Sequence, residues 1–534
     1  MSDIADKVAA IDSARQRRLL LKGALTSHAA LAVNVGVGLV LTSIVVRQLG
    51  VSQFGLWAII GSVVHYASLA GIGLPEGINR QTAFESGAGR VSAAFAAILA
   101  GFMLMSGLGL LAGVALVAAA DPLAQFFNVA PAGRGEFQTA LAAMALAIVF
   151  GIGSAALAAG LQGLERLGTL NAIVIVASLV KLAVTVVLLD LGWGLMALAG
   201  GIVLSNLVLL AGCLAALLAA AGRGRRPSID AVAGQLRPLL RFTAGTAVLG
   251  FACIVVTTSG VVVAGRLLAP AEVAIVAVVM MVAGHLLSLV VATLRPLSAR
   301  LANLAGAERT GEQARLLFRA LLVAGSISFA FLAMMVVAGE DLLVLWLGEA
   351  FRSAALPLAL VVVAYAISVA QVPLLQLILA RSQHHRYALL VAAEAVVNVG
   401  LSIWLGLRYG ILGVVLGTAL PLFVFRGFIT GIWGCRLLGL GLRRYALTIA
   451  APALAALLAI AVGANLVWPS GFAPAASLAL GLPLTGAVFV VATVAIVAVM
   501  DRVEGTGELN FIASMLPAPV GRLLARRVGE QGNG

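Results

Sequence analysis

Long apolar runs alternate along the chain with short polar segments, from residue 23 to residue 500. Each run is close to the ~20 residues that a helix needs to cross a hydrocarbon layer of ~30 Å. The runs are continuous, whereas the strands of a membrane β-barrel alternate apolar and polar positions over ~10 residues. We therefore expect an all-α polytopic membrane protein with about 14 transmembrane helices. The predicted spans are 23–46, 54–74, 91–120, 137–161, 169–189, 195–221, 243–264, 273–293, 320–338, 353–380, 388–406, 411–435, 445–467 and 476–500.

The composition of the 534-residue chain agrees with this pattern. Hydrophobic residues make up 62% and charged residues only 10%, against ~45–50% and ~25% in soluble domains. A water-soluble fold would have too little polar surface to cover such a core. The three cysteines lie within apolar runs, which is typical of buried thiols and not of a disulfide or zinc site.

The positions of lysine and arginine predict the orientation in the membrane. With the N-terminus in the cytoplasm, 27 of the 34 basic residues fall in cytoplasmic segments, five fall outside and two lie within spans. This bias follows the positive-inside rule, and a missed span would scramble it. Residues 1–22 are polar and basic and lack the apolar core of a cleavable signal peptide, so we expect the first span to remain as an anchor. Both termini are predicted to be cytoplasmic, and the basic clusters do not indicate a nucleic-acid partner.

The spans divide into two halves of six that repeat each other. The outside loops run short, long, shortest in both halves, and an offset of 219–221 residues relates Arg47 to Arg266, His65 to His285 and Pro75 to Pro296. Parallel repeats of this kind are typical of transporters, with a substrate path between them. The predicted parts are a cytoplasmic tail (1–22), an N-lobe with spans 1–6 (23–221), a basic cytoplasmic linker (222–242), a C-lobe with spans 7–12 (243–435), two extra helices (436–500) and a cytoplasmic amphipathic tail (501–534).

The chain lacks the sequence signals of a membrane enzyme or a primary pump. No outside loop exceeds about 16 residues, and no lysine follows a glycine as a phosphate-binding P-loop requires. The stretch Gly151-Ile-Gly153-Ser-Ala-Ala156 matches a dinucleotide fingerprint but lies inside a span, so close helix packing is the better explanation. We expect no enzymatic activity, no catalytic residues, no bound cofactor and no metal site.

Three stretches together resemble a known family. They are Val-Val-Arg47-Gln-Leu-Gly50-Val-Ser-Gln-Phe-Gly55-Leu-Trp57, then Leu69-Ala-Gly71-Ile-Gly73-Leu with Asn79-Arg80, and Asp341-Leu-Leu-Val-Leu-Trp-Leu-Gly348-Glu-Ala-Phe351. They are similar to the polysaccharide transporter (O-antigen flippase) family of bacterial inner membranes, which belongs to the multidrug/oligosaccharidyl-lipid/polysaccharide (MOP) exporter superfamily. The resemblance extends to the span number, the two six-span lobes and the extra C-terminal pair.

This resemblance implies a fold and a cargo. The fold would be two helical lobes around a central cavity that works by alternating access. The cargo would be an oligosaccharide on undecaprenyl diphosphate, moved from the cytoplasmic to the periplasmic leaflet of the inner membrane for O-antigen, capsule or exopolysaccharide synthesis. Implied partners are membrane lipids and a polysaccharide polymerase or assembly protein.

Two sister families supply the alternatives. Lipid II flippases carry several cavity arginines in their first lobe, whereas here the first two spans have His28 and His65 with arginine only at their ends. MATE-type small-molecule antiporters usually have twelve spans and an early intramembrane carboxylate, and the first lobe here has no such acid. Coupling to a H⁺ or Na⁺ gradient is left open.

Ionisable residues at membrane depth are the first candidates for the site, because each one costs at least ~2.5 kcal/mol to insert. Lys181 lies mid-way along span 5 and Arg426 lies within span 12, and both are candidates for contact with a diphosphate. Glu394 in span 11 is the candidate for ion coupling. The alternative for all three is structural, with Glu394 paired to Lys181 or to Arg426.

The remaining substrate-binding candidates are histidines and span-end arginines. His28, His65 and His285 could bind phosphate or relay protons, or they could be packing residues. Arg47 and Arg266 at the outer face, and Arg80 and Arg295 at the cytoplasmic face, could hold phosphate, or they could reach to lipid headgroups. Amides within spans, among them Asn34 and Gln371, could contact sugars or bond between helices.

Overall fold

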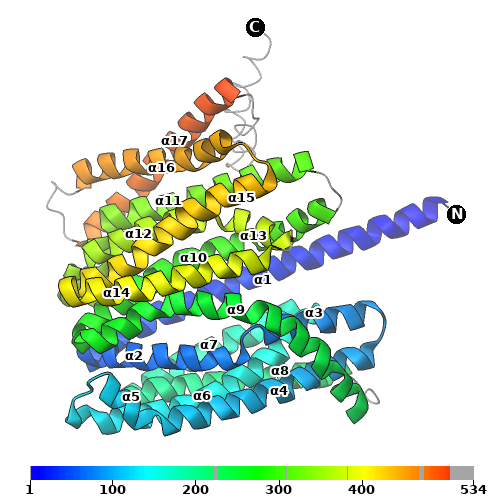
Figure 1. Cartoon of the computed structure of the whole chain (residues 1–534), viewed down its shortest axis with the longest axis horizontal. Coiled ribbons are helices and arrows are strands. Elements are labelled where there is room, and N and C mark those ends of the chain that lie inside the picture. Colours follow the sequence, from blue (N-terminus) through cyan, green and yellow to red (C-terminus); the bar gives the residue numbers. More distant parts are fainter. Residues whose placement is uncertain (1, 222–226, 307–309, 382, 468–473, 505–534) are drawn as a thin grey trace. The chain divides into compact units, whose positions relative to one another are not determined.

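The computed structural model describes residues 2–221, 227–306, 310–381, 383–467 and 474–504, and every regular element in these ranges is helical (Figure 1). Within them, the side chains of residues 2–25 and 295–300 are among those outside the described set. The predicted all-α class is confirmed. The predicted amphipathic segment after residue 504 lies outside the described residues.

The described residues divide into two compact units, one up to Ala274 and one from Ile275 onward. The first unit holds α1 (Ser2–Leu49), α2 (Val51–Ala67), η1 (Ser68–Gly71), α3 (Leu74–Gly87), α4 (Val91–Ala118), α5 (Ala120–Phe126), α6 (Pro131–Gly163), α7 (Leu167–Asp190), α8 (Leu195–Ala221) and α9 (Ile229–Leu267). The boundary falls early in α10 (Pro270–Gly306), which continues into the second unit.

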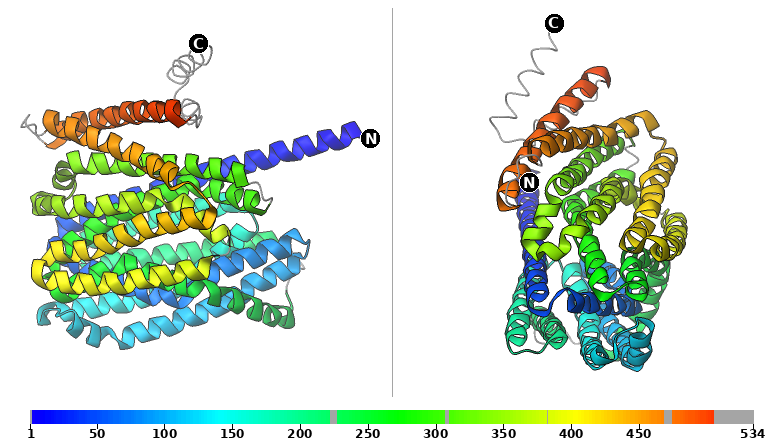
Figure 2. Two further views of the ribbon diagram at one scale, coloured as in Figure 1. Left: turned by 45° about the horizontal axis from the view of Figure 1, so that its top comes forward. Right: turned by 90° about the vertical axis from the view of Figure 1, so that its left-hand side faces the viewer.

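The second unit continues with α11 (Thr310–Leu347), η2 (Glu349–Ala354), α12 (Ala355–Ala370), α13 (Val372–Ala380), α14 (His384–Pro421), the π-helical segment η3 (Leu422–Ile429), α15 (Thr430–Leu438), α16 (Leu442–Val467) and α17 (Pro474–Glu504). Helices α16 and α17, which contain the two predicted extra spans, pack against each other and against α11 (Figures 1 and 2).

The described residues contain thirteen helical stretches that are long and apolar enough to cross a membrane. One of them, Arg386–Leu437, is two spans, because the backbone at Gly410 leaves the helical region with φ 58° and ψ −129°. Beyond this point the chain doubles back: a Cβ on Gly413 would meet the Leu405 carbonyl, and one on Gly417 would meet Ser402. The hairpin raises the total to fourteen, as the sequence predicts.

In the first unit, α6 packs closely against α4 on one side and against α8 on another. Gly151 and Gly153 of α6 explain how the helices approach so closely. A Cβ at Gly151 would lie 2.9 Å from the Asn206 amide nitrogen of α8, and one at Gly153 would lie 3.2 Å from the Ser106 hydroxyl of α4. The interpretation of this glycine pair as a packing motif is therefore confirmed.

The repeat-related prolines Pro75 and Pro296 occupy different structural settings. The second span of the N-lobe ends at η1, and Gly73 adopts a left-handed conformation before Pro75 opens the new helix α3. The corresponding Pro296 lies inside α10, which runs on to Gly306. In addition, α9 packs against α2, α3 and α4, so this predicted first helix of the C-lobe belongs to the first compact unit by its contacts. The lobe boundaries stay a prediction.

Candidate functional site

A polar seam runs between α1 and α7 in the first unit. The Asn171 amide of α7 donates hydrogen bonds to the Thr26 and Ser27 hydroxyls of α1, both at 3.0 Å. Seven residues further along α7, the Ser178 hydroxyl donates to the side-chain oxygen Oδ1 of Asn34 at 3.4 Å. Positions separated by seven residues share one helix face, so polar groups follow the α1–α7 contact for two helical turns.

Lys181 continues this polar face. It lies one turn beyond the buried Ser178 and about 15 Å along the axis from Asn171, at a rise of ~1.5 Å per residue. Its side chain is half-buried, and it forms no ion pair within the described part of the chain. Lys181 lies mid-way along the predicted span 169–189. An ammonium group within a span attracts anions, because the surrounding hydrocarbon provides little competing solvation.

Glu394 and Arg426 form a buried ion pair in the second unit. The Arg426 Nε lies 3.1 and 2.9 Å from the two carboxylate oxygens of Glu394. The Glu394 side chain is 1% exposed and that of Arg426 is 17% exposed. Of the two partners that the sequence leaves open for Glu394, the structure therefore brings Arg426 to it.

Two irregular helices meet beside this pair. Span 10 breaks between α12 and α13 at Gln371, whose amide donates to the Gly427 carbonyl of the π-helical segment η3. Arg426 precedes Gly427 on η3, so the same segment presents the guanidinium to Glu394. Discontinuous and π-helical segments within a membrane are frequent at functional sites.

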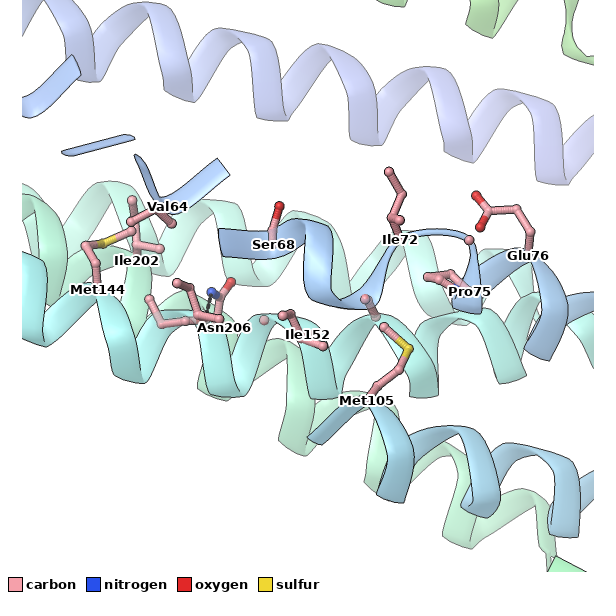
Figure 3. Close-up of a pocket in the computed structure, with 16 residues that line it drawn as sticks. Val64, Ser68, Ile72, Pro75, Glu76, Met105, Met144, Ile152, Ile202 and Asn206 are labelled. Carbon is pink, nitrogen blue, oxygen red and sulfur yellow. Dashed lines mark hydrogen bonds between the residues drawn. The ribbon is translucent and has the colours of Figure 1, made fainter. Parts of the chain in front are cut away.

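A cavity of about 370 Å³ lies in the first unit, lined by residues of α2, η1, α3, α4, α6 and α8 (Figure 3). Its walls are mostly apolar. Polar groups are few: Ser68, Glu76 and Asn206. Ser68 donates to the His65 carbonyl at 2.6 Å and Asn206 donates to the Ala147 carbonyl at 2.8 Å. None of the predicted histidine, lysine or arginine candidates lines this cavity, whereas Asn206, one of the span amides predicted to contact sugars or bond between helices, does.

A second, larger pocket of about 700 Å³ lies between α3 and the start of α9. Three arginines line it: the predicted candidate Arg80, and Arg237 and Arg241 of α9. All three side chains are exposed. The positive-inside rule predicts that this end of the helices faces the cytoplasm.

The other candidates are dispersed. His28, Arg47, His65 and Arg266 are exposed, and the Arg266 guanidinium lies 5.6 Å from the centre of the Phe126 ring. His285 is half-buried in α10, and its Nε2 makes no hydrogen bond with any described residue. The side chain of Arg295 lies outside the described residues.

Arg237 and Arg241 are the functional candidates that sequence reasoning missed, because both fall in the linker whose charge the positive-inside rule already explains. The spacing of residues in the sequence nevertheless predicts one face on each of the two helices that line the pocket. Gly77, Arg80, Gln81 and Phe84 follow the i, i+3, i+4, i+7 pattern of one helix face, and Arg237 and Arg241 are four residues apart.

Residues 20–302, just over half of the chain, match the family described as "Polysaccharide biosynthesis protein". Among curated proteins, none matches the sequence.

Several solved structures share the fold. A lipid II flippase, MurJ, in an inward closed conformation is 10% identical, with a TM-score of 0.66 over 90% of this chain and 99% of that one. A MATE family multidrug transporter of the MOP superfamily, inward-facing, is 16% identical, with a TM-score of 0.61 over 77% and 94%. A MOP superfamily transporter from Pyrococcus furiosus, described as having a binding pocket of reverse polarity, is 15% identical, with a TM-score of 0.55 over 78% and 95%.

Proposed function

The chain belongs to the polysaccharide biosynthesis protein family and has the fold of MOP superfamily transporters, and from this premise we propose that it is a flippase for an oligosaccharide linked to undecaprenyl diphosphate. The proposed direction is from the cytoplasmic to the periplasmic leaflet of a bacterial inner membrane, by alternating access. The glycan would serve O-antigen, capsule or exopolysaccharide synthesis.

The half-buried ammonium of Lys181 carries this proposal. A cargo of this class must bring a diphosphate through a layer that does not solvate it, so a cation on the path lowers the barrier. Lys181 lies at membrane depth at the end of a polar seam, with no ion-pair partner among the described residues. A transporter of cationic drugs would instead need a carboxylate in this place.

The seam also offers groups suited to a glycan. Hydroxyls and amides bind sugars through hydrogen bonds, and Thr26, Ser27, Asn34, Asn171 and Ser178 supply both kinds along α1 and α7. In the proposed mechanism, the prenyl chain stays in the bilayer while the polar head passes along groups of this kind. Glu394 is proposed as the ion-coupling residue, since protonation would weaken its hold on Arg426.

The test is transport in reconstituted vesicles. Vesicles carry the full-length protein and a polyprenyl-diphosphate oligosaccharide with a fluorescent sugar, and a membrane-impermeant quencher reports the fraction of label in the outer leaflet. We expect protein-dependent redistribution of the label. Lys181→Met should slow it at least tenfold, and Lys181→Arg should retain a measurable rate, because the charge is kept.

Leu179→Ala is the matched control, because Leu179 lies two residues away on α7 with a side chain that is 49% exposed. It should transport at the wild-type rate. Transport by Lys181→Met at the wild-type rate would contradict the assigned role of Lys181. Absence of any redistribution, together with cation-driven uptake of a small dye by the same vesicles, would replace the flippase with a MATE-type antiporter.

A further inference from the structure

The pocket between α3 and α9 combines three cations with apolar side chains. Its described lining consists of Gly77, Arg80, Gln81, Phe84, Gly234, Arg237, Pro238, Leu239 and Arg241, and none of these is acidic. At about 700 Å³ the pocket is large enough for more than a single ion. Such a lining suits a ligand that is strongly anionic at one end and apolar at the other.

Each helix presents its arginines on one face. On α3, Arg80 shares the pocket face with Gly77, Gln81 and Phe84, which recur at helical spacing. On α9, Arg237 and Arg241 are stacked one turn apart. The two helices therefore direct guanidinium groups into one space, and guanidinium groups bind phosphate oxygens through paired hydrogen bonds.

A hydrogen bond fixes the register of the two helices at the pocket. The Gln81 amide of α3 donates to the side-chain oxygen of Gln235 in α9 at 3.0 Å, and also to Glu85 at 3.1 Å. This bridge holds Arg80 and Arg237 on opposite sides of one cavity. The pocket is therefore built by a specific contact between α3 and α9.

Glu85, which accepts a hydrogen bond from Gln81, also pairs with an arginine outside the pocket. The Glu85 side chain is 9% exposed, and its second oxygen lies 2.6 Å from the Arg90 Nε, outside the pocket. This hydrogen bond and charge raise the pKa of Arg90 above its ordinary value. The Glu85 carboxylate is thus paired with Arg90 outside the pocket.

The surroundings favour a lipid over a soluble anion. Phe84 is 64% exposed at the pocket, and the predicted span of α9 begins at residue 243, two residues after Arg241. A headgroup held by the arginines would therefore have its hydrocarbon chain directed to an apolar wall and the bilayer.

We propose that Arg80, Arg237 and Arg241 form a binding site for the phosphate groups of a membrane lipid, and that this site receives the cargo diphosphate at the predicted cytoplasmic face before transport. The identity of the cargo rests on the proposed function. The phosphate chemistry is shared by bilayer phospholipids, so the experiment has one arm for each source.

The experiment measures lipid binding by native mass spectrometry, with the full-length protein in a maltoside detergent that carries no phosphate. The probes are undecaprenyl diphosphate in one arm and phosphatidylglycerol in the other. The triple variant R80Q/R237Q/R241Q should bind undecaprenyl diphosphate at least tenfold more weakly than the wild type. If the triple variant binds only undecaprenyl diphosphate more weakly, the site is assigned to the cargo. If it binds both lipids more weakly, the site is assigned to phosphate lipids in general. Both results support the phosphate site.

A matched control removes the same charge outside the pocket. Arg166, Arg386 and Arg436 are exposed, lie on the predicted cytoplasmic side and do not line the pocket. The variant R166Q/R386Q/R436Q should bind both probes within twofold of the wild type. Unchanged binding by the pocket variant, or an equal loss in the control, would overturn the proposal.

A second measurement on the wild-type protein does not depend on how the variants fold. Undecaprenyl diphosphate bearing a photoreactive group close to the diphosphate should cross-link to peptides of α3 and to peptides of α9 before residue 243, where the predicted span begins. Labelling confined to other helices would overturn the site. If the protein binds the lipid but does not transport it, the proposed function is contradicted and the proposed binding site still stands. If the wild-type protein transports the lipid and the pocket variant binds it as tightly as the wild type does, the proposed binding site is contradicted and the proposed function still stands.

Discussion

At the scale of single residues, the ion pair of Glu394 and Arg426 satisfies two charges that the hydrocarbon layer would otherwise oppose. Each charge at membrane depth costs at least ~2.5 kcal/mol to insert. The two hydrogen bonds from Arg426 Nε to the carboxylate offset part of this free energy. Removing one partner leaves the other buried and uncompensated, which is the more damaging change.

A double-mutant cycle tests this coupling. We expect Arg426→Met to lower the free energy of unfolding by about 3–5 kcal/mol, because the Glu394 carboxylate loses its counter-ion. Glu394→Gln should be less damaging, since Arg426 keeps some exposure. The double variant Glu394→Gln/Arg426→Met should recover much of the loss. Unfolding of the purified protein followed by circular dichroism gives the three values.

The informative result is the interaction term of the cycle. Contacting charges usually give values of about 0.5–3 kcal/mol. Strictly additive losses would mean that the pair contributes nothing as a pair, and that Arg426 acts through other contacts.

The sequence identifies these charged residues but does not show which of them pair with each other. Lys181, Glu394 and Arg426 stand out because they interrupt apolar runs. Their partners depend on the helical register, and the π-helical segment η3 adds residues to each turn and so rotates Arg426 relative to a regular helix. No hydrophobic pattern records this rotation. Arg237 and Arg241 do not stand out in the sequence, because they lie in a basic linker and the positive-inside rule already explains basic residues there.

At the scale of elements, the hairpin within α14 depends on glycines at the crossing of its two arms. A Cβ on Gly417 would lie 2.3 Å from the Ser402 Cα, and one on Gly413 would lie 2.0 Å from the Leu405 carbonyl oxygen. Both neighbours are backbone atoms, which cannot turn aside as a flexible side chain can. Only the absence of a side chain lets the arms approach so closely.

Alanine substitution at the crossing should therefore be destabilising. We expect Gly413→Ala and Gly417→Ala each to lower the free energy of unfolding by about 1–3 kcal/mol, the usual range for overpacking. Gly400→Ala is the control in the same helix, because a Cβ there would meet nothing within 4 Å. Thermal unfolding in detergent gives the comparison. A loss at Gly400 as large as that at Gly417 would mean that the effect does not come from the crossing.

The elements also show which parts of a membrane fold follow from hydropathy. The thickness of the bilayer fixes the length of each apolar run, so the fourteen spans are predicted within a few residues at most ends. The interruptions inside spans depend on packing instead. Pro75 lies in the first turn of α3, just after the left-handed Gly73, whereas Pro296 lies within α10, although the sequence repeat treats the two prolines as equivalent.

At the scale of the whole molecule, the hairpin at Gly410 bears on the prediction that both termini lie on the cytoplasmic side. If residues 386–437 crossed once, the chain would cross thirteen times, and the two termini would lie on opposite sides. Two crossings give an even number, which agrees with the prediction that both termini lie on the same side. The positive-inside rule independently requires this, because Arg436, Arg443 and Arg444 follow the second arm.

Cysteine accessibility distinguishes the two topologies. In a variant with Cys213, Cys253 and Cys435 replaced by alanine, single cysteines are introduced at exposed positions and labelled in intact cells with a membrane-impermeant maleimide. We expect Tyr409→Cys, beside the hairpin tip, to react from outside, as Trp193→Cys in the α7–α8 loop should. Gly441→Cys should react only after the cells are opened, as Ala88→Cys should. Labelling of Gly441→Cys in intact cells would contradict the hairpin topology, because only a single crossing from 386 to 437 carries that residue to the outer face.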